Sequence, residues 1–421
     1  MSRFAVFFAS LFAAVTLTYG AGFAILEQSV SGMGRGLAGM TAAKDDPSAL
    51  YFNPAGAAWV ERPTIHIGTH VLTGNVRFHD QESTLTGEKS GDIIGTSFIP
   101  NLDLTIPVGD GLNLSLAMTA TSGTSTKYNH YWMGRYFGIE TDIKMLEIQP
   151  SISYRITDEL AVGFGFMAQS ADVVMKQALN TAAYGNDSRI HMEGDCWSYG
   201  YALGVTYAPF EGTSFGLGYR SKMTHDADLK GKVKRLPAVL QAGLGLPHSF
   251  YRDEATLRLN MPQNVNFGVR QVVTDKLTLM ADVCWTDWHS MDEMTLKFKK
   301  GTVTGKKATE QMDWHYSWRF SFGGDYQLDE RWTLRAGFTF DERTVTNHAT
   351  KTSKLPDSNR YWASVGFSYQ WTSSLRLDCA FTHLFFQPSC IEQTDPVSHQ
   401  KIKGKFTGYT NLVSLGLRYE F

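Results

Sequence analysis

From Arg62 to the C-terminus, the chain alternates between apolar residues and polar or small residues in successive segments. The last segment, TNLVSLGLRYEF, shows the alternation most clearly. Side chains two positions apart fall on the same face of a strand, so one face of this segment is apolar and the other is polar or small. Such two-faced strands are typical of membrane barrels, in which one face contacts lipid and the other faces the lumen. The apolar face comprises Val413, Leu415, Leu417, Tyr419 and Phe421.

Short turn signals and longer polar stretches separate the alternating segments. The turn signals lie at 107–111, 157–159, 209–212, 274–276, 329–331 and 371–373. The longer polar stretches lie at 232–254, 300–310, 347–357 and 391–403. Short turns at one end and long loops at the other end are typical of outer-membrane barrels.

The segments predict fourteen strands. They begin near residues 63, 84, 111, 141, 159, 190, 213, 255, 276, 308, 331, 357, 373 and 402. Lipid cannot satisfy an open sheet edge, so a sheet of such strands must close on itself. We therefore predict an all-β fold, a 14-stranded antiparallel transmembrane β-barrel. A soluble exported sandwich or propeller is the competing fold, but the chain has no repeat of propeller length and ends on a strand with a terminal aromatic residue.

Tyrosine and tryptophan residues gather near the ends of the predicted strands. In membrane proteins these side chains concentrate at the lipid–water interface. The positions therefore predict aromatic girdles at the two membrane surfaces. They are Tyr128, Tyr131, Trp132, Tyr136, Trp285, Trp288, Trp314, Tyr316, Trp318, Tyr361, Trp362 and Trp371.

Residues 1–20 have the pattern of a secretory signal peptide. Arg3 supplies the positive charge, residues 4–17 are mostly apolar, and small residues follow up to Gly20. We predict cleavage after Gly20 and export of the mature chain. An N-terminal membrane anchor is the alternative, although the apolar run is short for a membrane span.

Residues 21–62 are rich in glycine and small residues and do not alternate. The glycines at 32, 34, 36 and 39 resemble a dinucleotide fingerprint, but that motif needs a preceding strand and a βαβ unit, which are missing here. Ser31 and Asp46-Pro47-Ser48 are candidate caps of short helices. A fourteen-stranded barrel is too wide for its own side chains to fill. We therefore predict a small helical hatch at 21–62 that plugs the lumen of a barrel at 63–421.

Composition and candidate chemistry exclude several classes of protein. The net charge of −2 does not suit a nucleic-acid partner, which requires a basic surplus. The four cysteines form no Cys-x-x-Cys pair, and the histidines lack metal-site spacing. Cys379 and Cys390 could form a disulfide across one hairpin or remain isolated small side chains. No catalytic constellation emerges, so we expect no enzyme, no metal and no cofactor.

Several motifs occur in the order that is typical of one family. They are AGF at 21–23, SGMGRG at 31–36, DDPSALYFNPA at 45–55, YRS at 219–221, WTDW at 285–288, WTLRAGFTFDE at 332–342 and LPDSNRYW at 355–362. With these motifs the chain resembles the long-chain fatty acid transporters of the Gram-negative outer membrane and their relatives for aromatic hydrocarbons. The final Phe421 resembles the signal that the barrel assembly machinery recognises. The resemblance covers essentially the whole mature chain.

The resemblance implies a monomer in contact with outer-membrane lipid and lipopolysaccharide. It implies a loop-side groove that captures hydrophobic substrate, a tighter pocket below it, and a kinked third strand through which substrate leaves sideways. In the family the N-terminus occupies the pocket, which makes Phe23 a candidate for ligand contact and gating. Asn53, Pro54 and Ala55 match the hatch signature and are expected beside the kink. Gly123 falls near the kink itself.

The resemblance also raises the question of a carboxylate anchor. Fatty-acid transporters hold the carboxylate with basic side chains of the barrel wall. At the matching place in the fifth strand this chain has Gln177, with Lys176 adjacent, and before the tenth strand it has Lys306 and Lys307. Lys176 and Lys307 are therefore candidate anchors, and solvated barrel lysines are the alternative. This departure leaves open a substrate without a carboxylate.

The resulting hypothesis is passive uptake of hydrophobic molecules across the outer membrane by capture in an apolar pocket and lateral release. Lateral release would avoid carrying an alkyl chain through water, at ~0.8 kcal/mol per methylene. A long-chain fatty acid is the lead substrate, and an aromatic or alkane hydrocarbon is the alternative. A structural or adhesin barrel with a permanently blocked lumen is a second alternative, and a general porin is a third.

Overall fold

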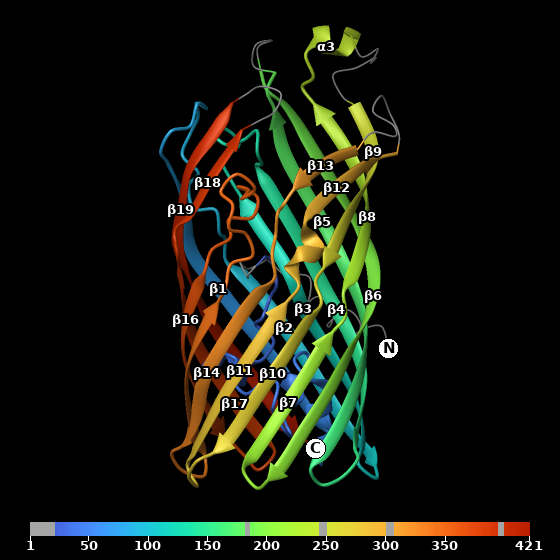
Figure 1. Cartoon of the computed structure of the whole chain (residues 1–421), viewed down its shortest axis with the longest axis vertical. Helices are drawn as coiled ribbons and strands as arrows, with labels where there is room; N and C mark the ends of the chain where they lie inside the picture. The colour runs from blue at the N-terminus through green and yellow to red at the C-terminus, as the bar shows by residue number, and fades with distance from the viewer. Residues whose placement is uncertain (1–21, 182–185, 244–250, 300–306, 395–399) are drawn as a thin grey trace.

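The computed structural model describes residues 22–181, 186–243, 251–299, 307–394 and 400–421, and the predicted signal peptide lies outside this part. The chain forms one closed antiparallel barrel with short helices inside it (Figure 1). Short turns lie at the lower end of the barrel in Figure 1, and longer loops extend from the upper end. By the rule for such barrels, the lower end is the periplasmic one.

Nineteen strand segments make up the sheet. The first ten are β1 (Thr64–Asp80), β2 (Ser97–Gly109), β3 (Leu112–Lys127), β4 (Glu140–Arg155), β5 (Leu160–Leu179), β6 (Ser188–Phe210), β7 (Thr213–Arg220), β8 (Met223–Lys234), β9 (Tyr251–Met261) and β10 (Asn264–Val272). The others are β11 (Leu277–Thr286), β12 (Glu293–Phe298), β13 (Lys307–Gln311), β14 (Ser317–Gln327), β15 (Trp332–Asp341), β16 (Arg360–Gln370), β17 (Leu375–Phe386), β18 (Ser389–Thr394) and β19 (Lys401–Glu420). A short helix, α3 (Ala238–Gly243), follows β8.

The nineteen segments correspond to fourteen barrel strands, which confirms the predicted fold class. Five barrel strands are interrupted, namely β7–β8, β9–β10, β11–β12, β13–β14 and β17–β18, and nineteen minus five gives fourteen. The barrel closes where β1 pairs with β19 from Thr64↔Glu420 to Asp80↔Gly404. Closure leaves no sheet edge exposed to lipid, as membrane insertion requires.

Thirteen barrel strands begin within four residues of the predicted positions, but the prediction for the second strand is wrong. That strand begins at Ser97 and not near residue 84. Residues 81–96 instead form a loop whose side chains bind the end of β1. Ser90 Oγ accepts a hydrogen bond from Phe78 N at 2.9 Å, and Asp92 Oδ1 accepts one from Val76 N at 3.0 Å. Leu85, Ile93 and Ile94 of this loop are buried in the core although the loop forms no strand.

The two faces of the strands follow the alternation in the sequence. On β19 the predicted apolar face is exposed on the outside of the barrel, whereas Ser414 and Gly416 are buried on the inside. The prediction of aromatic girdles is wrong for six side chains, which are buried instead of facing lipid: Tyr128, Trp132, Tyr136, Trp288, Trp314 and Trp362. Trp132, Trp288 and Trp314 lie in loops or strand interruptions, where alternation does not determine which way a side chain points.

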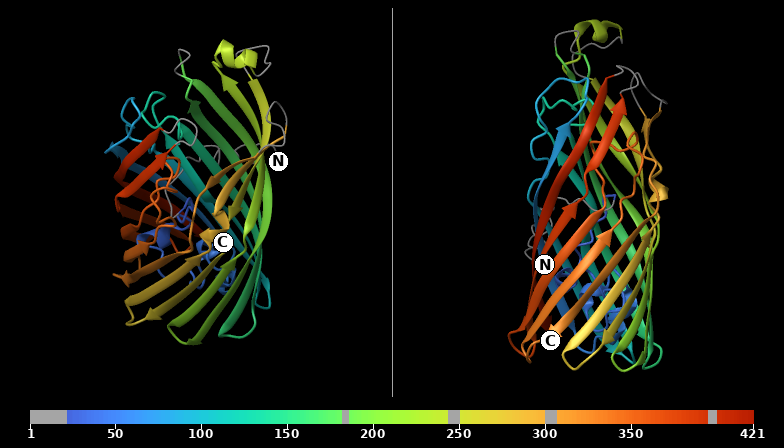
Figure 2. Two further views of the ribbon diagram at one scale, coloured as in Figure 1. Left: turned by 45° about the horizontal axis from the view of Figure 1, so that its top comes forward. Right: turned by 60° about the vertical axis from the view of Figure 1, so that its left-hand side comes forward.

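The residues before β1 lie inside the lower half of the barrel (Figure 1; Figure 2). They form α2 (Val30–Gly34) and two 3₁₀ helices, η1 (Pro47–Ala49) and η2 (Pro54–Trp59). Side-chain oxygens of Ser29, Asp46 and Asn53 cap these helices. Asp46 was a predicted cap, whereas the cap of α2 is Ser29 and not Ser31. Within the described residues, no helix is long and apolar enough to cross a membrane.

The hatch contacts all fourteen barrel strands. The helices contact β1 to β6, β15 to β17 and β19. Thr41 and Ala42 reach β7, β10 and β11, and Arg35 forms an ion pair with Asp325 of β14 at 3.1 Å. Glycines on the inner face allow this close approach. A Cβ atom added at Gly216 or Gly218 would overlap the carbonyl oxygen of Thr41 or Phe52, respectively.

Candidate functional site: a pocket beside a gap in the barrel wall

The barrel wall is interrupted between β2 and β3. The ladder between these strands ends at Asn101↔Thr119, and the pairing of β3 with β4 shifts register between Ala120 and Ser122. A bulge of this kind locally bends a strand and disrupts its pairing. Beyond this point, β2 no longer pairs with β3, which leaves an opening in the wall. We call this opening the wall gap.

The N-terminal segment Phe23–Ile25 occupies the wall gap. Ile25 N donates a hydrogen bond to Thr121 O at 2.9 Å, and Gly123 N donates one to Phe23 O at 2.7 Å. Ala24 and Ser122 form an isolated antiparallel bridge. The segment therefore satisfies backbone groups of β3 that β2 leaves unpaired, and it does so with only two backbone hydrogen bonds.

Phe23 lies in an aromatic cluster at the wall gap. Its ring centroid is 5.5 Å from that of Trp288 and 6.0 Å from that of Trp314, and the two tryptophans are 5.2 Å apart. All three side chains are almost fully buried. Tilted and edge-on contacts at these distances are favourable for aromatic rings.

Both tryptophans come from interruptions of the barrel strands. Trp288 begins the short 3₁₀ helix η4 (Trp288–Met291) between β11 and β12, and Trp314 lies between β13 and β14. Neighbouring strands are interrupted too, after Arg220 and after Met261. Residues from three of these interruptions, Ser221, Pro262 and Trp288, line one pocket.

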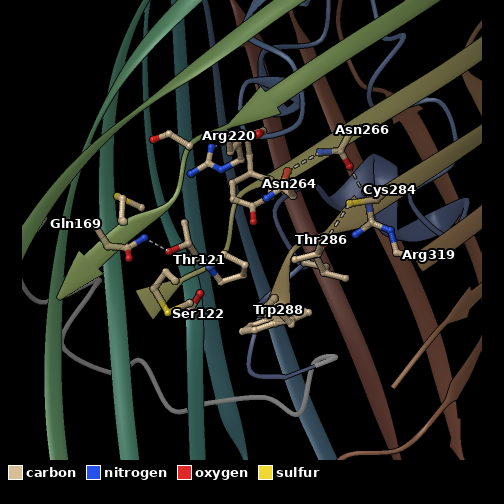
Figure 3. A pocket seen from close by; sticks show the side chains of 17 residues that line it. Thr121, Ser122, Gln169, Arg220, Asn264, Asn266, Cys284, Thr286, Trp288 and Arg319 are labelled. Atoms are coloured by element: carbon tan, nitrogen blue, oxygen red, sulfur yellow. Dashed lines mark hydrogen bonds between the residues drawn. The ribbon is translucent and has the colours of Figure 1, made fainter. Parts of the chain in front are cut away.

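This pocket lies between the wall gap and the interrupted strands (Figure 3). Its volume is about 60 Å³, which is too small for a long alkyl chain unless side chains or the N-terminal segment move. Ala24 of the N-terminal segment and Leu26, which follows the segment, contribute to its lining. In Figure 3, Gln169 and Thr121 lie on one side, and Asn266 and Arg319 lie on the other.

A large apolar cluster extends from the pocket inside the barrel. It contains Phe23, the two tryptophans and seven buried methionines, of which Met223 and Met261 also line the pocket. Methionine side chains are unbranched and flexible, so they adapt to ligands of different shapes. The buried methionines are Met145, Met167, Met192, Met223, Met261, Met291 and Met312.

Charged and polar groups separate the pocket from the hatch. Arg220 binds Glu147 in a buried ion pair, and its Nη1 donates a hydrogen bond to Gln149 Oε1 at 2.7 Å. Asp282 accepts hydrogen bonds from the backbone nitrogens of Gly39 and Thr41 and so fixes the hatch to β11. Bonds to an ionised carboxylate are among the stronger hydrogen bonds in proteins.

Asn53, Pro54 and Ala55 lie against β5 and β6. Asn53 Nδ2 donates hydrogen bonds to Thr41 O at 2.7 Å and to Val205 O at 3.0 Å. Further along the same helix, Ala57 O accepts a hydrogen bond from Asn113, which lies seven residues before the bulge. The expected position beside the kink is therefore wrong, because the signature fixes the hatch to the periplasmic half of the wall.

The two candidate lysine anchors do not reach the pocket. Lys176 points to the outside of the barrel, where its Nζ forms an ion pair with Glu140 at 2.8 Å. Lys307 is exposed at the start of β13, opposite Lys297. Gln177 donates a hydrogen bond to Tyr136 O, and Lys306 lies outside the described residues.

Cys379 and Cys390 do not form a disulfide, and all four cysteines are free. Cys379 faces outward on β17, and Cys390 lies on β18 opposite Lys405. Among the described residues, no three His, Cys, Asp or Glu side chains are grouped as metal ligands.

A closed barrel, a hatch that touches every strand, and a pocket beside a wall gap with an apolar cluster next to it define an outer-membrane transport protein. A family model described as "Outer membrane protein transport protein (OMPP1/FadL/TodX)" matches residues 11–421, and the chain belongs to this family. The family consists of transport channels of the Gram-negative outer membrane and not of enzymes.

Known relatives agree with this assignment. The chain is 26% identical to the long-chain fatty acid transport protein of Escherichia coli O6:H1 over 403 residues, which is 88% of each chain. It shares its fold with a Pseudomonas aeruginosa FadL homologue (TM-score 0.85, 24% identity, 95% of this chain and 100% of the other). It also shares its fold with the Ralstonia pickettii toluene transporter TbuX (TM-score 0.70, 18% identity, 94% and 100%).

Proposed function

We propose that this protein mediates passive uptake of hydrophobic molecules, with long-chain fatty acids as the main substrates. The observation that supports this proposal is that the pocket, which the apolar methionine-rich cluster adjoins, shares the N-terminal segment with the wall gap. Substrate would enter the methionine-rich cluster from the loop side, displace Phe23–Ile25 and leave sideways into the outer leaflet. The protein would act as a monomer, and Phe421 would direct its assembly into the membrane.

The lateral route follows from the energetics of an alkyl chain. Each methylene that moves from an apolar site into water costs ~0.8 kcal/mol. The hatch blocks the way straight down the lumen, and polar groups such as Arg35 of the hatch and Asp282 of β11 hold it in place. A route through the wall gap keeps the alkyl chain in apolar surroundings from the pocket to the lipid.

An aromatic or alkane hydrocarbon is the alternative substrate, and the name of the toluene transporter TbuX supports it. A permanently blocked barrel is the second alternative. Uptake of radiolabelled oleate and toluene by an Escherichia coli strain without its own long-chain fatty acid transport protein would separate the three. Oleate uptake above the empty-vector control supports the proposal. Toluene uptake alone supports the hydrocarbon alternative, and no uptake supports the blocked barrel.

Replacing Trp288 by alanine is expected to weaken oleate binding by roughly tenfold or more, because the indole supplies apolar contact area in the pocket and supports Phe23. Binding of radiolabelled oleate to purified protein measures the effect. Trp371→Ala is the matched control, because Trp371 is 61% exposed on the outside of the barrel. An unchanged affinity in the Trp288 variant would show that oleate binds elsewhere.

A further inference from the structure

Strand β8 carries a row of lysines on the outer face of the barrel wall. The segment at 229–235 reads LKGKVKR, and its alternation places Lys230, Lys232 and Lys234 on the outside. Lys230 and Lys234 are exposed, and Lys232 is half-buried. This end of β8 lies in the upper half of the barrel, where the strand pairs with β6 on one side and β9 on the other (Figure 1).

Basic side chains of two neighbouring strands extend this row. In the ladder between β6 and β8, Arg189 lies opposite Lys234. His191 lies opposite Lys232 on one side and opposite Lys176 of β5 on the other. Residues directly opposite each other in antiparallel strands are close neighbours on one face of the sheet. We call this surface the basic patch, and it consists of Lys176, Arg189, His191, Lys230, Lys232 and Lys234.

Positive charge exceeds negative charge in the basic patch. Lys176 forms an ion pair with Glu140 at 2.8 Å. Lys232 forms one with Glu193 at 3.0 Å. Three other cations have no carboxylate within ion-pair distance among the described residues, and like charges that face each other across two strands are destabilising. These cations are Arg189, Lys230 and Lys234.

A second row of lysines on the wall is largely neutralised by the protein itself. Lys401, Lys403 and Lys405 lie on the outer face of β19 with the same spacing as the row on β8. Lys401 forms an ion pair with Glu392 at 2.6 Å, and Lys403 forms one with Glu82 at 2.7 Å. The excess charge of the basic patch is therefore not a general consequence of lysines on an outer strand face.

The basic patch lies beyond the lipid-facing part of the wall. The outer face of β6 is apolar or aromatic from Tyr207 to Trp197, and Trp197 is 55% exposed. Exposed aromatic side chains on the outer face mark the lipid–water interface of a barrel. His191 lies six positions beyond Trp197, which is about 20 Å along the tilted strand. The patch is therefore level with the sugars of the outer leaflet and not with its acyl chains.

A row of aspartates separates the basic patch from the aromatic side chains. Asp195 lies opposite Asp172 on one side and opposite Asp228 on the other. Asp228 forms an ion pair with Lys299 at 2.6 Å, which leaves the row with a net negative charge. This row repels phosphate groups at the level where the acyl chains end. The basic patch attracts phosphate groups that lie further from the membrane.

We propose that the basic patch binds phosphate groups on the core sugars of lipopolysaccharide. Lipopolysaccharide occupies the outer leaflet of a Gram-negative outer membrane, and its phosphates lie both beside the acyl chains and on the core sugars. Lysine side chains bind phosphate as point charges, and basic side chains near a membrane surface are attracted to anionic lipids. The patch spans three strands, so it offers cations to more than one phosphate of the same molecule. This site lies outside the lumen and is independent of the proposed uptake function.

The experiment measures binding of lipopolysaccharide with a phosphorylated core to purified protein in detergent, by microscale thermophoresis at low ionic strength. Lys230→Gln/Lys232→Gln/Lys234→Gln should weaken binding by about tenfold or more, because three cations near the phosphates are lost. Lys401→Gln/Lys403→Gln/Lys405→Gln is the matched control. It removes the same charge from lysines that are largely paired within the protein, so binding should weaken by less than about twofold.

Three further probes identify the ligand. Lipid A has phosphates but no core sugars, and it should bind the wild type and the β8 variant equally. A loss of lipid A binding in the β8 variant would overturn the assignment to core phosphates. Displacement of lipopolysaccharide by millimolar sodium phosphate would overturn it too, because the patch would then serve a small anion. Double-stranded DNA that binds as tightly through the same lysines would assign the patch to soluble polyanions instead.

A second variant tests the patch from the neighbouring strands. Lys176→Gln/Arg189→Gln removes cations of β5 and β6 and should also weaken binding by several-fold. This variant decides the matter if the β8 variant does not fold into a heat-modifiable barrel. Unchanged binding in either folded variant, or an equal loss in the β8 variant and the β19 control, would overturn the inference.

Discussion

Replacing Gly216 and Gly218 together by leucine is expected to convert the barrel into an ion-conducting pore. Side chains at these positions would occupy the space of the Thr41 and Phe52 carbonyl groups, so the hatch could not seat against β7. The lumen of a fourteen-stranded barrel is too wide for wall side chains to fill, and water would enter it. Conductance in planar lipid bilayers should rise by roughly an order of magnitude or more over the wild type.

Gly95→Leu is the control for this experiment, because no atom lies within 4 Å of a Cβ added at Gly95. The control should conduct no more than the wild type. Swelling of liposomes in arabinose provides an independent measurement of the open lumen. If the double variant folds and stays closed, the hatch is held by something other than its fit against the inner glycines.

The sequence allowed most of the barrel to be predicted because lipid imposes a strict pattern on each strand. Alternation in 410–421 correctly placed Leu415 outside and Ser414 inside. The same reasoning failed where the chain leaves the ladder. The loop at 81–96 buries Leu85, Ile93 and Ile94 without forming a strand, and Trp288 and Trp314 lie in strand interruptions. In these places tertiary packing, and not period-two alternation, decides which way a side chain points.

The pocket was harder to predict than the barrel. The resemblance to the family singled out Phe23 and Gly123, and the structure joins these two residues by a backbone hydrogen bond. No local sequence pattern could have predicted that contact. It also suggested Lys176, which the structure places in an external ion pair. Arg319 was missed, although a signal was present. The segment SWRFSFGG puts an arginine between two serines on the inward face, where a charge is unusual unless it has a partner.

The surroundings of a buried charged side chain are formed by residues of its own strand and of the neighbouring strands. Asn266, Asp282 and Arg319 lie on the neighbouring strand segments β10, β11 and β14, and the pairing of these segments brings them together. The sequence could indicate that Arg319 faces inward. It could not indicate that Asp282 is held by the hatch backbone, which leaves the arginine without a carboxylate.

A disulfide between residues 24 and 122 is expected to abolish uptake. Ala24 and Ser122 form an antiparallel bridge, and the Cα separation of such pairs, about 4.5–5.5 Å, lies within the range that a disulfide spans. The variant Ala24→Cys/Ser122→Cys, made in a background with the four native cysteines replaced by serine, would hold the N-terminal segment in the wall gap. Oleate uptake should fall to background and return after reduction.

The matched control is Thr105→Cys/Ser115→Cys, which joins β2 to β3, the two strands that flank the wall gap, at a position where they are still paired. The side-chain oxygens of these two residues are 2.9 Å apart, and they are direct partners in the ladder. This crosslink leaves Phe23–Ile25 free to move, so uptake should remain at the wild-type rate. Full uptake by protein whose residues 24 and 122 are quantitatively crosslinked would mean that substrate does not pass through the wall gap. The N-terminal segment is joined to β3 by two backbone hydrogen bonds, whereas neighbouring barrel strands are joined by whole ladders, so we expect this segment to be the part that moves.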